Sequence, residues 1–262
     1  IESEWQNRSP YHKLHLQSDY LTADISGNFQ YNTLPKTCQQ ILHTYFPSLI
    51  DAPKTTNKRP NHLNFYAYFR ELETISHVLD LSVSLPSYPT LKGFINERNQ
   101  QIGLQAHIPR IQTSGAQIDN LTISVENDYD SLDIAVYMYN RLPKDNPTAA
   151  KIGDVKAHIN MRAKQDKIDL QISLDNTDSV RNEGVINISS KIARYANKPL
   201  IDIHVHPSDF LLNDSAWNVT ESQIAFNAHD QKIYINNICY SISIRNKTKR
   251  RCIDYTIIIT FF

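Results

Sequence analysis

The residues best suited to chemistry lie in one short stretch, "LIDIHVHP", from Leu200 to Pro207. In it three polar residues alternate with three apolar ones, namely Asp202, His204 and His206 with Ile201, Ile203 and Val205. Because successive side chains of a strand point to opposite faces, the carboxylate and the two imidazoles would share one face. Such side chains are ligands for zinc or iron. The stretch therefore suggests a metal-dependent enzyme.

This D-x-H-x-H stretch resembles the metal-binding strand end of the amidohydrolase superfamily, where an H-x-H pair closes the first barrel strand. Such a barrel needs alternating strands and helices over about 250 residues, with further ligands from later strands. Here few residues follow His206; they look like further strands, and His229 is the only histidine among them. These three residues therefore have two interpretations. They are ligands of a metal-dependent hydrolase, or they form the solvent-facing side of an amphipathic strand.

Other catalytic and nucleotide-binding motifs are missing from the sequence. Ser26-Gly27 and Ser114-Gly115 do not form the G-x-S-x-G of a nucleophile elbow. The chain has 6 glycines in 262 residues, where average usage gives roughly 18, and neither G-x-G-x-x-G nor a P-loop occurs. We therefore expect no enzyme activity and no cofactor.

Charge and cysteine usage exclude further classes. The formal net charge is zero and the pI is about 7.3, which gives no general attraction to nucleic acid or to an anionic membrane surface. The three cysteines, Cys38, Cys239 and Cys252, show no C-x-x-C spacing. This argues against a zinc knuckle or a disulfide-dense scaffold and leaves a single Cys239–Cys252 bridge open.

The two ends of the chain suggest a piece of a longer protein. "IESEWQNRSP" is polar, charged and unlike a signal peptide. The apolar run from Thr256 to Phe262 is far shorter than the ~20 residues that span a bilayer. We expect residues 246–262 to be an atypical, truncated tail.

Period-2 alternation dominates the sequence and predicts a mostly β fold. "KIDLQISLDN", for example, alternates Ile168, Leu170 and Ile172 with polar residues. Residues 1–95 are predicted to hold strands, a helix at 34–49 and a possible second helix at 71–81. Residues 96–245 are predicted to be one continuous β segment.

The apolar face of so many strands must be buried in a sandwich or a closed barrel, or else line a long curved sheet. Its side chains are mainly Ile, Leu and Val along the whole length. This uniformity favours an elongated antiparallel groove. A structural or adhesive protein with a closed β-core remains the alternative.

Several segments, in this order, resemble the TamB (translocation and assembly module) family in its Bacteroidetes-type members. "FLLNDSAWNVTESQIAFNAHDQKIYINNI" is similar to its recurring element, in which an Asx turn leads to a Trp, an apolar-alternating strand and an I-x-I-x-N strand. The matching positions are Asn213, Asp214, Trp217, Ile224, Phe226, Ile233, Ile235 and Asn236. "LQSDYLTADISGNFQYNTLPKTCQQILHTYFPSL" and "GAQIDNLTISVENDYDSLDIAV" resemble its strand–helix and two-strand units. The resemblance runs through about Ile244.

This resemblance implies a periplasmic protein, anchored in the inner membrane, that bridges the envelope of a Gram-negative bacterium. AsmA-like relatives share a U-shaped β-groove lined with apolar side chains. The implied roles are phospholipid transport to the outer membrane and assembly of outer-membrane proteins with a barrel partner. No enzyme activity belongs to the family, and the neutral net charge already argued against a nucleic-acid partner.

The strand faces then predict which side chains would line a groove for phospholipid acyl chains. They are Leu121, Ile123, Val125, Ile134, Val136, Ile168, Leu170, Ile172, Ile188, Ile201, Ile203 and Val205. Each acyl CH₂ exposed to water costs about 0.8 kcal/mol. A continuous apolar surface would remove most of that cost without specific binding residues.

Overall fold

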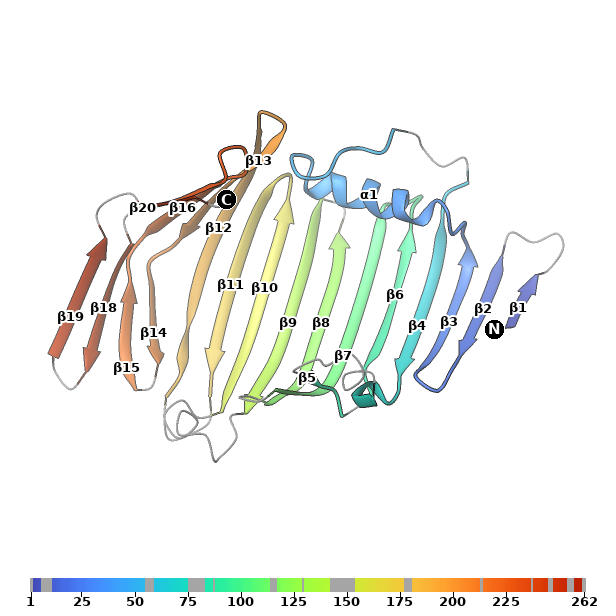
Figure 1. The fold of residues 1–262 in the computed structure, drawn as a ribbon, viewed down its shortest axis with the longest axis horizontal. Coiled ribbons are helices and arrows are strands. Elements are labelled where there is room, and N and C mark those ends of the chain that lie inside the picture. Colours follow the sequence, from blue (N-terminus) through green and yellow to red (C-terminus); the bar gives the residue numbers. More distant parts are fainter. Residues whose placement is uncertain are drawn as a thin grey trace.

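The structure is a computed structural model and consists mainly of one open sheet (Figure 1). It describes residues 2–5, 11–54, 59–74, 83–86, 88–113, 117–128, 130–141, 154–176, 181–212, 214–236, 238–244, 247–253 and 257–260. Strands make up 67% of the residues and form one large antiparallel sheet that does not close into a barrel. Ordinary soluble domains have about 20–25% strand. The predicted fold class, mostly β with an open antiparallel sheet, is confirmed.

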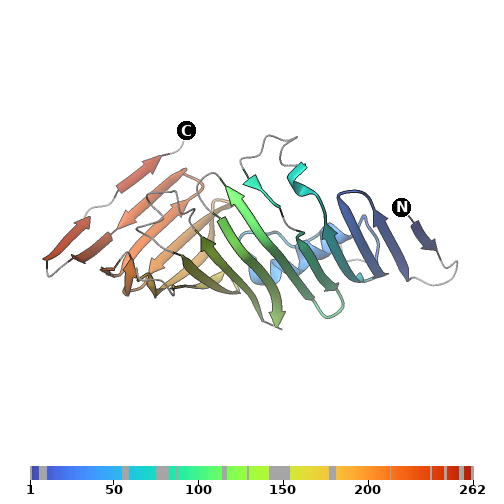
Figure 2. The ribbon, with the colours of Figure 1, turned by 90° about the horizontal axis from the view of Figure 1, so that it is seen from below.

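Neighbouring strands follow chain order through most of the sheet, as in a meander. The order is β1 (Glu2–Trp5), β2 (His12–Gln17), β3 (Leu21–Asn28), β4 (His62–Phe69), β6 (Thr90–Asn96), β7 (Gln101–Thr113), β8 (Gln117–Asp128), β9 (Ser131–Arg141), β10 (Val155–Lys164), β11 (Lys167–Asp175) and β12 (Glu183–Tyr195). The short β5 (Val83–Ser84) pairs with the end of β7. The molecule is longest across its strands, and its sheet is twisted rather than flat (Figure 2).

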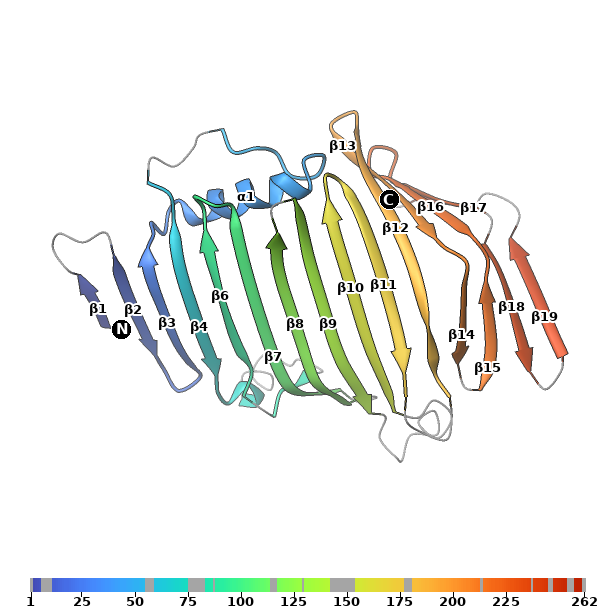
Figure 3. The ribbon, with the colours of Figure 1, turned by 180° about the vertical axis from the view of Figure 1, so that it is seen from behind.

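The sheet forks at β12, because two strands pair with the same edge of it (Figure 3). One arm consists of β13 (Lys198–Val205), β16 (Ser222–Asn227), β17 (Lys232–Asn236) and β20 (Ile257–Thr260). The other consists of β14 (Ser208–Leu212), β15 (Ser215–Val219), β18 (Ile238–Ile244) and β19 (Lys247–Ile253). The predicted boundary at 95/96 lies at the end of β6, and β19 and β20 continue the sheet into the region expected to be an atypical tail.

Gly184 makes the fork possible. It lies opposite Phe210 of β14, has φ of +149°, and a Cβ there would be 2.3 Å from the Phe210 Cβ. Residues other than glycine rarely adopt this φ, and Phe210 already occupies the space that a Cβ at position 184 would need. Pro207 lies between β13 and β14. Because proline has no backbone N–H to donate to a neighbouring strand, it favours a break between these two strands.

Two hairpins turn without glycine, which helps to explain how so few glycines suffice. Gln165 and Asp166 join β10 to β11, and Ala196 and Asn197 join β12 to β13, each with positive φ. Positive φ at both central residues is the geometry of a two-residue type I′ turn. Asp and Asn tolerate this conformation better than most residues do.

The helix α1 (Leu34–Tyr45) begins with Pro35 in its first turn, as the sequence predicts. It ends four residues before the expected Leu49, because Pro47 disfavours helical backbone at the residue before it, Phe46. Of the possible second helix, Leu72 to Thr74 are helical, and 75–81 lie outside the described residues.

The best buried part of the molecule lies between α1 and one end of the strands, across β4 to β10 (Figure 1). Its buried side chains are Phe29, Ile41, Tyr45, Leu63, Ile95, Leu132 and Ala163. The segment after α1 is tied to the sheet as well. The Ser48 backbone N–H donates to the Asp166 carboxylate at 2.9 Å, and the Ser48 carbonyl accepts from Arg194 at 3.0 Å.

A buried polar cluster fixes the start of β4 against α1. The Glu97 carboxylate accepts hydrogen bonds from the Thr37 hydroxyl at 2.8 Å and from the Asn61 backbone N–H at 2.7 Å. The Asn61 amide donates to Glu97 and Thr37, and its oxygen accepts from the Gln30 backbone N–H at 2.7 Å. Asn61 is 1% exposed, so water cannot replace these partners.

We predict that Asn61→Leu destabilises the chain, since it removes the shared partner of Gln30, Thr37 and Glu97. Each buried polar group left without a partner costs roughly 1–3 kcal/mol. Urea unfolding followed by circular dichroism measures the effect. Asn64→Leu, at an exposed position of β4, is the matched control; an equally small effect at both positions would contradict a structural role for the cluster.

Candidate functional site

The register of the strands places all twelve predicted groove residues on one face of the sheet. One row crosses β8 to β13 through Val125, Ile134, Met161, Leu170, Ile188 and Val205. The next row crosses β8 to β12 through Ile123, Val136, Ile159, Ile172 and Ile186. Leu121, Ile168 and Ile203 lie two residues along their strands from members of these rows, and Ile201 lies four residues from Val205, so all four are on the same face. We call this surface the apolar face.

The apolar face is only partly shielded from water. All twelve side chains have intermediate exposure, and none belongs to the buried set. Val125 and Ile168 pack against the core beside α1. A closed β-core would bury central residues such as Ile172 almost completely. Within the described residues, the one helix that packs on this face, α1, covers it near one end of the strands.

The structure adds residues to this face that the predicted set of lining residues did not include. Ile159 and Met161 of β10 and Ile186 of β12 fill the gaps between predicted positions. The signal was present in "VKAHINMRAK", where Ala157, Ile159, Met161 and Ala163 alternate with polar residues. The two alanines weaken the apolar pattern, and both are buried.

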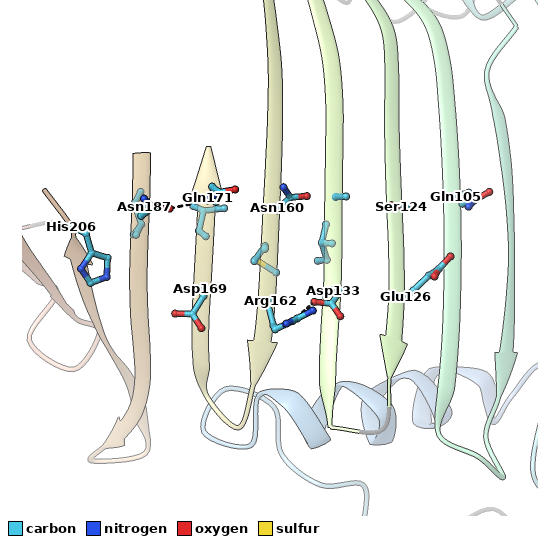
Figure 4. A pocket seen from close by; sticks show the side chains of 15 residues that line it. Gln105, Ser124, Glu126, Asp133, Asn160, Arg162, Asp169, Gln171, Asn187 and His206 are labelled. Carbon is cyan, nitrogen blue, oxygen red and sulfur yellow. Dashed lines mark hydrogen bonds and ion pairs between the residues drawn. The ribbon is translucent and has the colours of Figure 1, made fainter. Parts of the chain in front are cut away.

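The opposite face carries a shallow polar trough of about 780 Å³ across β7 to β12 (Figure 4). Two cross-strand rows line it, together with Ile134, Met161, Leu170 and Ile188 from the positions between these rows. The first is Gln105, Ser124, Ala135, Asn160, Gln171 and Asn187. The second includes Glu126, Asp133, Arg162 and Asp169. We call this hollow the polar trough.

Several side chains of the polar trough pair with one another. Arg162 Nε donates to the Asp133 carboxylate at 2.7 Å, and this hydrogen bond and charge raise the pKa of the Arg162 guanidinium. The Gln171 amide donates to the Asn187 side-chain oxygen at 3.1 Å. These contacts are exposed to solvent, so each contributes little to stability. The face that carries the polar trough is therefore exposed to solvent.

His206 and Ser189 lie at one end of this face, with 2.9 Å between His206 Nε2 and Ser189 Oγ. This is a distance at which a base could activate a hydroxyl nucleophile. A working triad also needs a group that orients the histidine through Nδ1. Within the described residues His206 has no carboxylate contact of this kind, so the geometry supplies a hydrogen-bonded pair rather than a triad.

The three candidate metal ligands are not brought together. Asp202 and His204 lie on the polar side of β13, opposite Lys191 and Ser189 of β12. His206 continues this pairing past the last residue of β13: its backbone N–H donates to the Asn187 carbonyl at 2.9 Å, and its ring contacts Ser189, so it lies on the same side as Asp202 and His204. In the part of the chain that the structure describes, no three His, Cys, Asp or Glu side chains form a group that could hold a metal ion.

The chain matches no protein-family model, no curated protein and no solved structure. No helix within the described ranges combines the length and apolar character needed to cross a bilayer. The candidate functional feature is the sheet itself. One of its sides is the half-shielded apolar face, and the other side carries the polar trough.

An apolar face open to solvent should bind an environment-sensitive apolar dye in the native state. We predict that Ile172→Asp reduces native-state fluorescence of 1-anilinonaphthalene-8-sulfonate, because it places a charge in the middle of the face. Gln171→Asp adds the same charge on the opposite face and should leave the fluorescence unchanged. Equal losses in the two variants, or no dye binding by the unmodified chain, would contradict this assignment of the faces.

Proposed function

We propose that the chain is part of a TamB-like bridge across a Gram-negative cell envelope, in which the apolar face carries phospholipid acyl chains between the inner and outer membranes. The same face could instead guide outer-membrane proteins during assembly with a barrel partner. The proposed location is the periplasm, with anchoring in the inner membrane through segments outside this chain. The proposed role needs no catalytic group and no cofactor.

The observation that carries this proposal is the continuity of the apolar face. Its first row crosses six neighbouring strands, from β8 to β13, without a charged side chain. Strands lie ~4.8 Å apart, so the row extends about 24 Å. One acyl chain spans about half of a ~30 Å hydrocarbon core. The row is therefore long enough to hold an acyl chain across the strands.

Energetics favour a continuous surface over a specific pocket for this task. A lipid crossing an aqueous space exposes both acyl chains, at about 0.8 kcal/mol for each CH₂. Side chains such as Leu170 and Ile172 replace that water with apolar contact at every step of the path. Since no single residue dominates, substitution of one apolar residue by another should have little effect on transport.

The two rival functions make different demands on the structure. A metal-dependent hydrolase needs Asp202, His204 and His206 around one ion, and their placement on and beyond β13 does not provide this. A structural or adhesive protein with a closed core needs the apolar face covered by a second layer. The intermediate exposure of all twelve residues supports the lipid role over this alternative.

We predict that a photocrosslinking amino acid at Ile172 forms phospholipid adducts in envelope-containing cells, because this side chain lies in the centre of the apolar face. Mass spectrometry of the purified adduct identifies the lipid. The matched control is the same amino acid at Gln171, one residue away on the polar trough, which should give no lipid adduct.

Each other outcome has a definite meaning. Adducts with unfolded outer-membrane proteins at Ile172 would favour the assembly role over lipid transport. Adducts at neither position would contradict both roles and would favour a structural protein with a closed β-core. Equal lipid adducts at both positions would show contact that does not depend on the face of the sheet.

A further inference from the structure

Two of the three cysteines lie directly opposite each other at one edge of the sheet. Seven residue pairs join β18 and β19, from Ile238 with Ile253 to Ile244 with Lys247, and the second of them is Cys239 with Cys252. Four residues further along β18, the pair formed by Ser243 and Thr248 has its two hydroxyl oxygens 2.8 Å apart. This contact is consistent with the register of the hairpin.

The backbone positions of such a pair suit a disulfide. Directly opposite residues in an antiparallel ladder have Cα atoms about 4.5 or 5.5 Å apart, depending on whether the pair is hydrogen-bonded. A disulfide needs a Cα separation of about 4.4–6.8 Å. Both kinds of pair therefore satisfy this condition without movement of the strands.

The third cysteine, Cys38, lies in a different environment. It is part of α1, is half-buried, and packs against the core between the helix and the sheet. Burial raises the pKa of the Cys38 thiol, which lowers the fraction of reactive thiolate. Cys38 is therefore the thiol expected to stay reduced when the others are oxidised.

We propose that Cys239 and Cys252 form a cross-strand disulfide that ties β19 to β18. A thiolate of one cysteine attacks the disulfide of a small-molecule or protein oxidant and releases one oxidant thiol. The other cysteine then attacks this mixed disulfide and releases the second. In balance, two cysteine thiols lose two protons and two electrons, and one oxidant disulfide becomes two thiols.

The bond would secure the outermost strand of one arm of the fork. Within the described residues β19 pairs with β18 alone. Its sequence, "KTKRRCI", has four basic residues, which discourage pairing of this edge with other chains. A disulfide here persists in an oxidising compartment such as the periplasm, although the proposal itself rests on the strand register and not on the lipid role.

The test is a thiol count on the unmodified full chain after equilibration with oxidised and reduced glutathione. In denaturant we expect one reactive thiol per chain, from Cys38, instead of three. Trypsin cleaves after Arg245 and Lys247, so Cys239 and Cys252 fall in different peptides. Mass spectrometry should find these two peptides joined, and reduction should separate them.

Variants distinguish this pairing from other oxidation products. Cys38→Ser should leave the joined peptides unchanged and reduce the thiol count to zero. Cys239→Ser should release Cys252 and give two thiols. Three thiols in the unmodified chain, a disulfide that includes Cys38, or disulfide-linked dimers on a non-reducing gel would each overturn the proposal. The count on the unmodified chain does not require any variant to fold.

Discussion

The structure depends on the register of antiparallel pairing. Side chains alternate between the two faces of a strand, so a shift of one residue in any ladder would move apolar side chains to the wet face. From β8 to β13 the register keeps residues such as Val125, Leu170 and Val205 in one row. A continuous apolar face on one side and a polar trough on the other follow directly from this alignment.

The remaining features hold this alignment in place. The helix α1 packs on one end of the apolar face, and the hydrogen bonds around Asn61 and Glu97 fix its position against β4. The Asp166 turn sets the pairing of β10 with β11 and also binds the segment that follows α1. Gly184 then lets Phe210 approach β12, so that the sheet divides without losing its pairing.

Period-2 alternation was sufficient to predict the fold class and the shared face of residues such as Ile123, Ile172 and Ile203. Helical spacing and Pro35 predicted the start of α1. Each of these depends on short-range pattern. The fork at β12 depends on one glycine and one proline acting between distant strands, and the polar trough depends on cross-strand register, which no local pattern encodes. Alternation also placed His206 on the same side as Asp202 and His204, but a shared side does not make a metal site, and within the described residues the three side chains form no metal-binding group.

The central claim is that the apolar face accepts acyl chains, and native mass spectrometry tests it most directly. The chain would be incubated with phosphatidylethanolamine and phosphatidylglycerol vesicles, separated from them without detergent, and weighed intact. The account predicts a protein carrying phospholipid, with the lipid-bound fraction reduced by Ile172→Asp and unchanged by Gln171→Asp. A protein that remains free of lipid, or one that binds lipid equally in both variants, would contradict it.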